Sequence, residues 1–305
     1  MSISELSTDI LVVGAGPAGS SAAAWSARLG RDVLLADAED FPRDKTCGDG
    51  LTPRAIAELN RLGMDDFLKG RPVNLGLRGQ GFGQTRYLPW NGPHLPTRGS
   101  AAPRMELDAA IRQRALDSGA QALSGARAVS VEFEGDRLAA VVFARGDEQI
   151  RVRAQAFVVA DGARSQTGRH LGRVWHKDTV YGVAARGYID SGRSDDAWIS
   201  SHLELRGTKN EILSGYGWIF PLGGGKVNIG VGTLATDSRP ADINLRPLMS
   251  IYGEQQREEW QLTGEISAAK SALLPMGGAV SGVSRTNRVL VGDAAGCINP
   301  LNGEG

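Results

Sequence analysis

Three glycine-containing motifs in this chain have the residue types that hold a dinucleotide. The first, GAGPAG at residues 14–19, has the GxGxxG spacing. Gly14 permits a tight turn, Gly16 leaves room for a pyrophosphate, and Gly19 allows the following helix to pack closely on the strand. Asp37 follows at about the spacing, roughly 20 residues, expected of a carboxylate that binds a ribose hydroxyl. The motif predicts a dinucleotide site without distinguishing NAD from FAD.

The second and third motifs are ADGARS at residues 160–165 and VGDAAG at residues 291–296. Each follows an apolar run that is typical of a buried strand. Asp161 taken alone is explained equally well as an ordinary turn residue, and so is Asp293. Because three such motifs follow one another in the chain, they favour one shared site at the carboxyl ends of parallel strands.

An aromatic strand is the second candidate for chemistry. Tyr216, Trp218 and Phe220 alternate, so their side chains should point to one face, and Pro221 is expected to end the strand. Such a face can cover an isoprenoid or a flavin ring without polar groups that need partners. The alternative is that the same face is ordinary domain core.

Cys47 lies in a loop of turn-forming and charged residues, 41–51, which we expect to contain no strand. Its thiol could supply a proton, or it could be a small buried spacer. Arg43, Asp44 and Lys45 could contact phosphates or be solvated loop charges. Cys297 is expected to serve packing only.

Composition narrows the function further. The 34 basic and 34 acidic residues balance, so no polyanionic partner such as nucleic acid is implied. The two cysteines and four scattered histidines form no metal-binding pattern. No apolar run reaches the 18 or so residues of a membrane-spanning helix. These features predict a cytoplasmic protein.

The predicted fold class is α/β, with a doubly wound dinucleotide-binding domain and an antiparallel α+β substrate domain. Pro17 and Ala18 should begin the first helix, because proline has no N–H to lose in the first turn. The sequence ends just after a motif expected to open a helix, so we expect a further C-terminal helical part. The first domain is predicted to comprise residues 1–72, 99–175 and 285–305, and the second residues 73–98 and 176–284. Predicted strands cover residues 10–13, 33–36, 126–133, 138–145, 150–152, 156–160, 179–189, 197–205, 216–220, 226–232 and 288–291, and predicted helices cover 17–30, 53–62, 104–116 and 243–253.

Together the three motifs resemble the flavoprotein monooxygenase superfamily, which includes aromatic hydroxylases, flavin halogenases and geranylgeranyl reductases. Two further stretches, PRDKTCGDGL at 42–51 and YGWIFPLGGGKVNIGVG at 216–232, resemble the geranylgeranyl reductase family. CGDGLTPRA and LLPMGGAVSGV are most similar to its actinobacterial branch that reduces menaquinone. The resemblance implies a glutathione-reductase-like FAD domain and a substrate domain like that of p-hydroxybenzoate hydroxylase.

The resemblance also implies FAD as cofactor and assigns residues to it. Asp293 would hold the ribityl chain, Asp161 and Gly162 the pyrophosphate, and Arg104 would reach the same phosphates. The loop with Cys47 would pass over the flavin, and the aromatic motif would line the substrate cavity. The full set of implied cofactor contacts is Gly14, Gly16, Pro17, Ala18, Gly19, Asp37, Lys45, Thr46, Cys47, Gly48, Arg104, Ala128 near adenine, Asp161, Gly162, Gly292, Asp293 and Gly305.

The implied activity is saturation of an isoprene double bond in a prenyl lipid, most simply the menaquinone side chain or a geranylgeranyl group. A membrane surface would then be the source of substrate, and the enzyme would be peripheral on the inner face of the cell membrane. No second GxGxxG is present for a resident nicotinamide, so electrons would come from a transient donor, NAD(P)H or a redox protein. Two alternatives stay open, a flavin monooxygenase or halogenase and a non-enzymatic prenyl-lipid binding protein.

Overall fold

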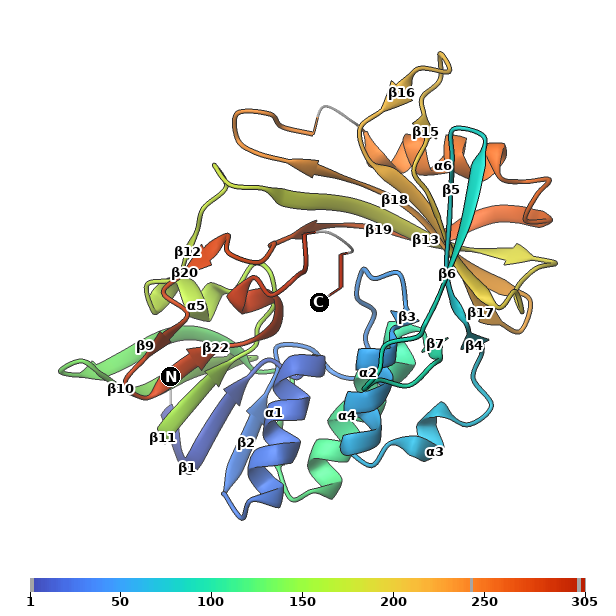
Figure 1. The fold of residues 1–305 in the computed structure, drawn as a ribbon. Coiled ribbons are helices and arrows are strands. Elements are labelled where there is room, and N and C mark those ends of the chain that lie inside the picture. Colours follow the sequence, from blue (N-terminus) through green and yellow to red (C-terminus); the bar gives the residue numbers. More distant parts are fainter. Residues whose placement is uncertain (1–2, 242–243, 301–302, 305) are drawn as a thin grey trace. The chain divides into compact units, whose positions relative to one another are not determined.

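The computed structural model describes residues 3–241, 244–300 and 303–304. These residues divide into two compact units, each of which gathers segments far apart in the sequence (Figure 1). Unit 1 contains residues 1–43, 105–181 and 274–305, and unit 2 contains residues 44–104 and 182–273. Residues 44–72 thus belong to the same compact unit as the aromatic strand, whereas the sequence placed them with the dinucleotide-binding motifs.

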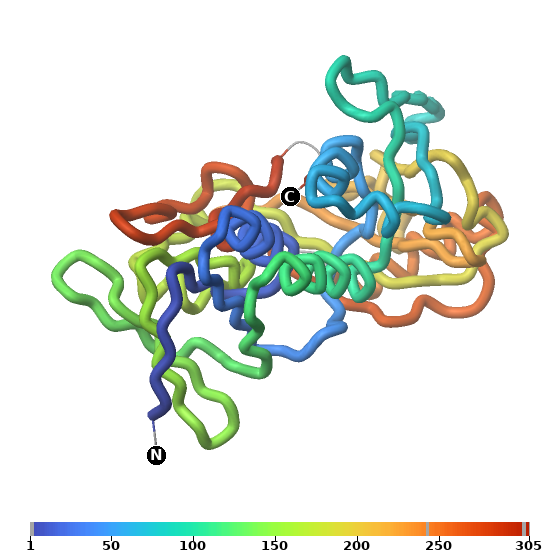
Figure 2. Tube along the Cα trace, turned by 90° about the horizontal axis from the view of Figure 1, so that it is seen from below, coloured from blue at the N-terminus to red at the C-terminus, as the bar shows by residue number. Residues whose placement is uncertain are grey.

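Unit 1 is built on an eight-stranded sheet with strand order β21-β22-β11-β1-β2-β8, to which β10 and β9 add through β11. The five strands from β22 to β8 run parallel. Most of α4 lies beside α1 (Figures 1 and 2). The elements of this unit are β1 (Ile3–Val13), α1 (Pro17–Arg28), β2 (Val33–Ala36), α4 (Arg104–Asp117), β8 (Gln121–Leu123), β9 (Arg127–Glu134), β10 (Arg137–Arg145), β11 (Glu148–Val159), α5 (Gln166–His170), β12 (Val174–Trp175), β20 (Val280–Ser281), β21 (Ser284–Arg285), β22 (Arg288–Leu290) and the 3-10 turn η1 (Gly292–Ala295).

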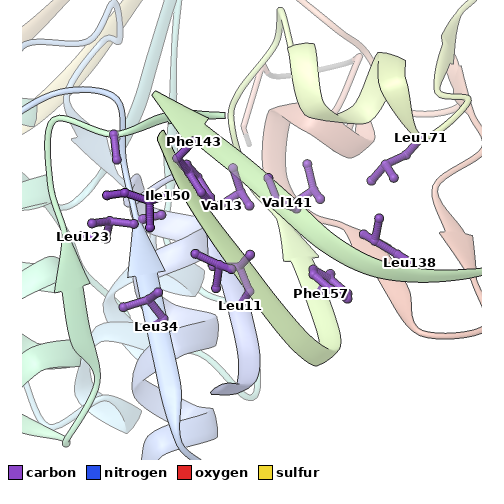
Figure 3. Packing of buried hydrophobic residues seen from close by; sticks show 14 of the residues in the cluster. Leu11, Val13, Leu34, Leu123, Leu138, Val141, Phe143, Ile150, Phe157 and Leu171 are labelled. Carbon is purple, nitrogen blue, oxygen red and sulfur yellow. The ribbon is translucent and has the colours of Figure 1, made fainter. Parts of the chain in front are cut away.

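The core of unit 1 is the layer between the parallel strands and the β9–β10 hairpin (Figure 3). Leu11 and Val13 of β1 meet Leu34 of β2, Phe143 of β10 and Phe157 of β11 in one buried cluster. Runs of consecutive apolar residues in β1 and β2 are typical of parallel strands that are covered on both faces. This core fixes the strand ends at which the glycine motifs begin.

Unit 2 is built on a seven-stranded sheet with order β19-β13-β18-β17-β14-β5-β6. The pairs β17–β18, β14–β17 and β5–β6 are antiparallel, while β14 and β5 are parallel. Helix α6 packs against β18 and buries Leu248, Met249 and Tyr252 in the core of the unit. The elements are β3 (Gly50–Leu51), α2 (Pro53–Arg61), α3 (Asp65–Leu68), β4 (Val73–Asn74), β5 (Gly76–Gly81), β6 (Gln84–Pro89), β7 (Gly99–Ala101), β13 (Tyr181–Ser191), β14 (Trp198–His202), β15 (Leu205–Arg206), β16 (Ile212–Leu213), β17 (Tyr216–Gly223), β18 (Lys226–Ala235), α6 (Leu245–Gln255) and β19 (Leu262–Leu274).

The structure corrects several predicted elements. Residues 150–152 and 156–159 belong to one strand, β11, which pairs with β10 over its first half and with β22 at its end. Gly50–Leu51 forms a short strand with β7 inside the loop expected to contain none. The third motif forms η1 and then a left-handed turn at Gly296, where an α-helix was expected.

Pro221 does not end its strand. It lies within β17 and pairs with Val227 of β18. The pairing with β14 covers only Gly217–Ile219, so the missing proline N–H interrupts no bond on that side. The sequence also missed β19, an edge strand whose left-handed residues Gly264 and Ala268 break the alternation of side chains.

Candidate functional site

The three glycine motifs meet within unit 1. Each begins at the residue that follows a neighbouring parallel strand: Gly14 after β1, Ala160 after β11 and Val291 after β22. Backbone hydrogen bonds continue the ladder into the motifs, from Ala160 N to Val13 O at 2.7 Å and from Val291 N to Val159 O at 3.0 Å. The carboxyl ends of parallel strands are where such sheets bind ligands.

The glycines are required by close backbone approaches. A Cβ on Gly14 would stand 2.4 Å from the carbonyl oxygen of Ala160, and one on Gly19 would stand 1.8 Å from the carbonyl oxygen of Gly14. A Cβ on Gly292 would stand 2.8 Å from the Cβ of Ala18. The first motif therefore touches both the second and the third.

The N-terminus of α1 has the character of an anion site. Gly16 is its N-cap and Pro17 occupies the first turn, and no described side chain caps the helix. Arg43 lies beside this turn, with Nη2 3.3 Å from where a Cβ of Gly16 would stand. Its guanidinium pairs with the buried carboxylate of Asp108 at 3.0 Å and stacks on the ring of Phe41. Helix dipole and guanidinium together favour a phosphate group here.

Asp37 is held by backbone N–H groups at the end of β2. Its Oδ2 accepts from Ala15 N at 2.6 Å, and its Oδ1 accepts from Glu39 N at 2.9 Å. Each carboxylate oxygen keeps further acceptor capacity. The carboxylate is thereby oriented next to the glycine turn, where a ribose hydroxyl could donate to it.

The second motif also stabilises the local fold, a role that the sequence did not distinguish from cofactor binding. Asp161 accepts hydrogen bonds from the Ser165 hydroxyl and from Thr167 N, and so supports the start of α5. Gly162 adopts a left-handed φ of 81°. The buried Arg173, which the sequence did not single out, donates to Ala163 O and to Ala294 O. This one side chain joins the second motif to the third.

The remaining candidates for cofactor contacts lie in four places. Asp293 is half-buried in η1, which packs against the start of α1. Ala128 lies in β9 against the unit 1 core. Arg104 begins α4. Gly305, which the resemblance assigns to the flavin, lies outside the described residues.

The aromatic strand and the Cys47 loop meet within unit 2. The ring centroids of Tyr216 and Trp218 are 5.8 Å apart, and those of Trp218 and Phe220 are 6.4 Å apart, so the three side chains share one face. The backbone of the loop lies on this row, since a Cβ on Gly48 would stand 2.9 Å from Cε2 of Phe220. Trp218 is only 6% exposed, whereas Tyr216 and Phe220 are half-buried.

Polar groups from β13 and β18 hold the loop. Asn228 of β18 donates to Cys47 O at 2.8 Å and to Asp49 Oδ2 at 3.0 Å. The hydroxyl of Tyr188 donates to Asp49 Oδ2 at 2.7 Å. Asp49 N donates to the sulfur of the half-exposed Cys47 at 3.4 Å. The sequence offered one signal for this set, a single asparagine in the otherwise apolar run of β18.

The charged residues before Cys47 in the loop are held by side chains of β13 and β19. Arg186, fully buried, pairs with Asp44 and donates to Lys45 O and Ala268 O. Lys270 pairs with Asp44 at 3.0 Å. Asp44 is therefore an internal ion-pair partner, and Thr46 stands between this anchor and Cys47 in the chain.

Burial and neighbouring charges shift the pKa values of three ionisable residues in this part of unit 2. Burial raises the pKa of Asp49, although hydrogen bonds from Tyr188 and Asn228 and the charges of Arg186 and Arg104 oppose the rise. Burial also raises the pKa of Tyr188, and the Asp49 carboxylate raises it further. For Asp44, burial alone would raise the pKa, but the bonds and charges of Lys270 and Arg186 lower it overall.

Fold and site thus define a dinucleotide-binding α/β protein of the flavoprotein type. Residues 7–305 match the family of the FAD binding domain. The chain is 59% identical over 298 residues to the menaquinone reductase of Mycolicibacterium smegmatis, covering 97% of this chain and 72% of that protein. It is 29% identical over 309 residues to digeranylgeranylglycerophospholipid reductase 1 of Methanopyrus kandleri, covering 97% and 76%.

Solved structures share the fold. A geranylgeranyl bacteriochlorophyll reductase-like protein from Thermoplasma acidophilum matches with a TM-score of 0.79 at 23% identity, over 98% of this chain and 74% of that one. The myxobacterial chondrochloren halogenase matches with a TM-score of 0.79 at 21% identity, over 98% and 71%. The chain belongs to the FAD-binding family, in the geranylgeranyl reductase group that contains the menaquinone reductases. The expectation of FAD rather than NAD is confirmed.

The residues of unit 1 fit this cofactor. The uncapped start of α1 beside Arg43 suits a pyrophosphate, and the carboxylate of Asp37 suits a ribose. The glycines at the three strand ends leave the backbone free of Cβ atoms where it must approach a ligand. Among the described residues, no helix is long and apolar enough to cross a membrane.

Proposed function

We propose that this protein is an FAD-dependent reductase that saturates an isoprene double bond in the side chain of menaquinone. One observation carries the proposal: the Cys47 loop packs on the aromatic row of β17, in a chain 59% identical to a menaquinone reductase. A cysteine-containing loop packed on apolar rings suits a substrate that has no polar group at the reacting carbons. A geranylgeranyl lipid has the same chemistry and is the nearest alternative substrate.

When bound and reduced, FAD supplies a hydride to one carbon of the alkene. The chain must then position the alkene, exclude water and provide a proton for the other carbon. An unactivated alkene develops no oxyanion, so positioning and water exclusion carry most of the catalysis. Tyr216 and Phe220 provide apolar surface for the isoprenoid, with Trp218 packed between them and Pro221 next in the strand.

Cys47 is our candidate for the proton donor. Its side chain is half-exposed, and the N–H of Asp49 points at its sulfur. A water molecule held by the same loop is the alternative donor. Lys45, Thr46 and Gly48 would place this loop against the flavin.

The wider assignment follows the same proposal. In this proposal unit 1 would form the FAD-binding domain, which resembles that of glutathione reductase, and unit 2 would form the substrate domain. Asp293 and Gly292 would hold the ribityl chain and the phosphates, together with Asp161, Gly162 and Arg104. The enzyme would collect its lipid from the inner face of the cell membrane and receive electrons from a transient donor.

Mass spectrometry of quinones from cells with and without the natural protein that contains this chain tests the function. We expect menaquinone from cells without the protein to have two hydrogens fewer in its side chain than menaquinone from cells with it. An unchanged tail would refute menaquinone as substrate. Oxygen uptake with NAD(P)H and a phenolic or indolic substrate would instead assign a monooxygenase or halogenase, and purified protein without flavin absorbance would assign a lipid carrier.

A further inference from the structure

Asn228 is a fully buried polar residue in the middle of β18, and it makes three hydrogen bonds. Its Oδ1 accepts from the indole N–H of Trp218 at 2.9 Å. Its Nδ2 donates to the backbone carbonyl of Cys47 and to the carboxylate of Asp49. A buried amide whose oxygen accepts one bond and whose nitrogen donates two has one orientation only, because a rotated amide would face donor to donor and acceptor to acceptor.

Asp49 is the second fixed point of the loop. It adopts a left-handed φ of 62°, which is costly for a residue with a Cβ and needs support from its surroundings. Its carbonyl accepts from Ala102 N at 3.0 Å, and its Oδ2 accepts from Tyr188 and Asn228. The same residue presents its N–H to the sulfur of Cys47. The position of the thiol therefore depends on the conformation that these bonds impose.

We propose that Asn228 is a positioning residue for the Cys47 thiol, which it acts on through the Cys47 carbonyl and the Asp49 carboxylate. In this assignment Trp218 orients the amide of Asn228 through its indole N–H. Trp218, the central residue of the aromatic motif, thus influences the geometry of the Cys47 loop through Asn228. The inference deepens the proposed function, since it rests on Cys47 as the proton donor, but its main test needs no turnover.

Unit 2 contains a matched control for this arrangement. Asn74 of β4 is also buried, accepts from the indole N–H of Trp90 at 2.7 Å and donates to the carbonyl of Ser100 at 2.8 Å. It makes the same kind of bridge from an indole to a backbone carbonyl, but among the described residues its bonds go to Trp90 and Ser100 and not to the Cys47 loop. Asn74→Ala therefore measures the general cost of losing such a bridge.

The experiment compares the alkylation rate of Cys47 by iodoacetamide in the natural protein and in Asn228→Ala, Asn228→Asp, Trp218→Phe and Asn74→Ala. Tryptic peptide 46–54, which contains Cys47, reports the modification by mass spectrometry. One buried hydrogen bond is worth roughly a fivefold change in an equilibrium, so Asn228→Ala should change the rate by at least about that factor. Asn228→Asp should change it more, since its second oxygen would face the Cys47 carbonyl and the Asp49 carboxylate.

Trp218→Phe keeps one aromatic ring and removes the indole N–H together with the five-membered ring, so it should shift the rate in the same direction as Asn228→Ala. It also keeps the test decisive where Asn228→Ala does not fold. Asn74→Ala should lower the melting temperature and leave the alkylation rate unchanged. The inference is wrong where Asn228 and Asn74 variants alter the rate equally, or where the Asn228 and Trp218 variants alter it not at all.

Turnover adds a second, separate readout. With a menaquinone substrate, Asn228→Ala should lower kcat and leave KM nearly constant, because the proton donor is displaced while the apolar surface stays. Absence of reductase activity in the natural protein, together with the expected alkylation pattern, would refute the proposed function and leave the positioning role intact.

Discussion

The Cα of Gly14 lies so close to Ala160 that a Cβ on it would stand 2.4 Å from the Ala160 carbonyl oxygen. This contact joins the strand ends of β1 and β11, from which two of the three cofactor motifs start. We expect Gly14→Ala to push them apart and to abolish FAD retention, measured as flavin absorbance per protein after gel filtration.

Gly30→Ala is the control for that variant. Gly30 also has a left-handed φ, 77°, but nothing lies within 4 Å of its absent Cβ. This substitution should cost about 1 kcal/mol of unfolding free energy through backbone strain alone and leave the flavin content unchanged. Equal flavin content in both variants would contradict the role assigned to the Gly14 contact.

Arg43 should contribute to cofactor affinity as well as to stability. Arg43→Met removes the cation beside the α1 N-terminus and the ion pair to buried Asp108. We expect FAD to bind at least about tenfold more weakly, because a lost charge-assisted bond to phosphate is worth roughly 1.5–3 kcal/mol. Titration of the apoprotein with FAD measures the dissociation constant. Asp108→Asn, which disturbs the pair but keeps the cation, should weaken FAD binding less; the reverse order would place Arg43 in a purely structural role.

The half-buried Asp44 and the buried Asp49 should give the free energy of unfolding opposite dependences on pH. The pKa of Asp44 is lowered in the folded state, so its contribution is present above the ordinary value of 3.8 and is lost as pH falls through the folded pKa. The pKa of Asp49 is raised, so its ionisation costs stability as pH rises from 3.8 through the folded pKa. Melting temperatures across acidic pH should show a flatter acid limb for Asp44→Asn and a smaller loss toward neutral pH for Asp49→Asn. If the melting temperatures of both variants followed pH in parallel, the opposite pKa shifts of Asp44 and Asp49 would be contradicted.

Replacing the thiol tests the proton donor. If Cys47 protonates the substrate, Cys47→Ala should lower kcat by roughly 10²–10⁴ with KM nearly unchanged. Cys297→Ser, at the other cysteine, which is exposed, should leave kcat as it is. A loss of less than about tenfold in Cys47→Ala would favour a loop-held water as the acid. Single-turnover reoxidation of reduced flavin by menaquinone provides the measurement.

The strand ends of unit 1 were predictable because their sequence signals are local. An apolar run followed by a glycine turn identifies β1, β11 and β22 without knowledge of the rest of the chain. Helix α2 begins after Thr52, whose hydroxyl accepts from Ala55 N, again a local pattern. What the sequence did not reveal depends on contacts between distant residues. The link from Arg173 to Ala294 leaves no signature in neighbouring residues, and the lone asparagine of β18 does not reveal that its partner is the Cys47 carbonyl.

Pro221 and β19 show the same limit for secondary structure. A proline normally argues against a strand interior, and only the extent of the β14 pairing explains why it is tolerated in β17. The polar, irregular sequence of β19 can form a strand because β19 lies at the edge of the sheet, where most of its side chains stay exposed. Tertiary context decided both cases.

The strand order of unit 1 has a consequence for synthesis of the chain. β22 pairs with β11 so that Leu290 lies opposite Val159, and all of unit 2 ends at residue 273, before β22 begins. A ribosome therefore releases every residue of unit 2 before it releases β22 and the third glycine motif that follows it. Parallel pairing between such distant segments is slow to form, because loop closure precedes the gain from contact. Unit 2 can thus fold before β22, the last of the described strands of the unit 1 sheet in chain order, pairs with β11.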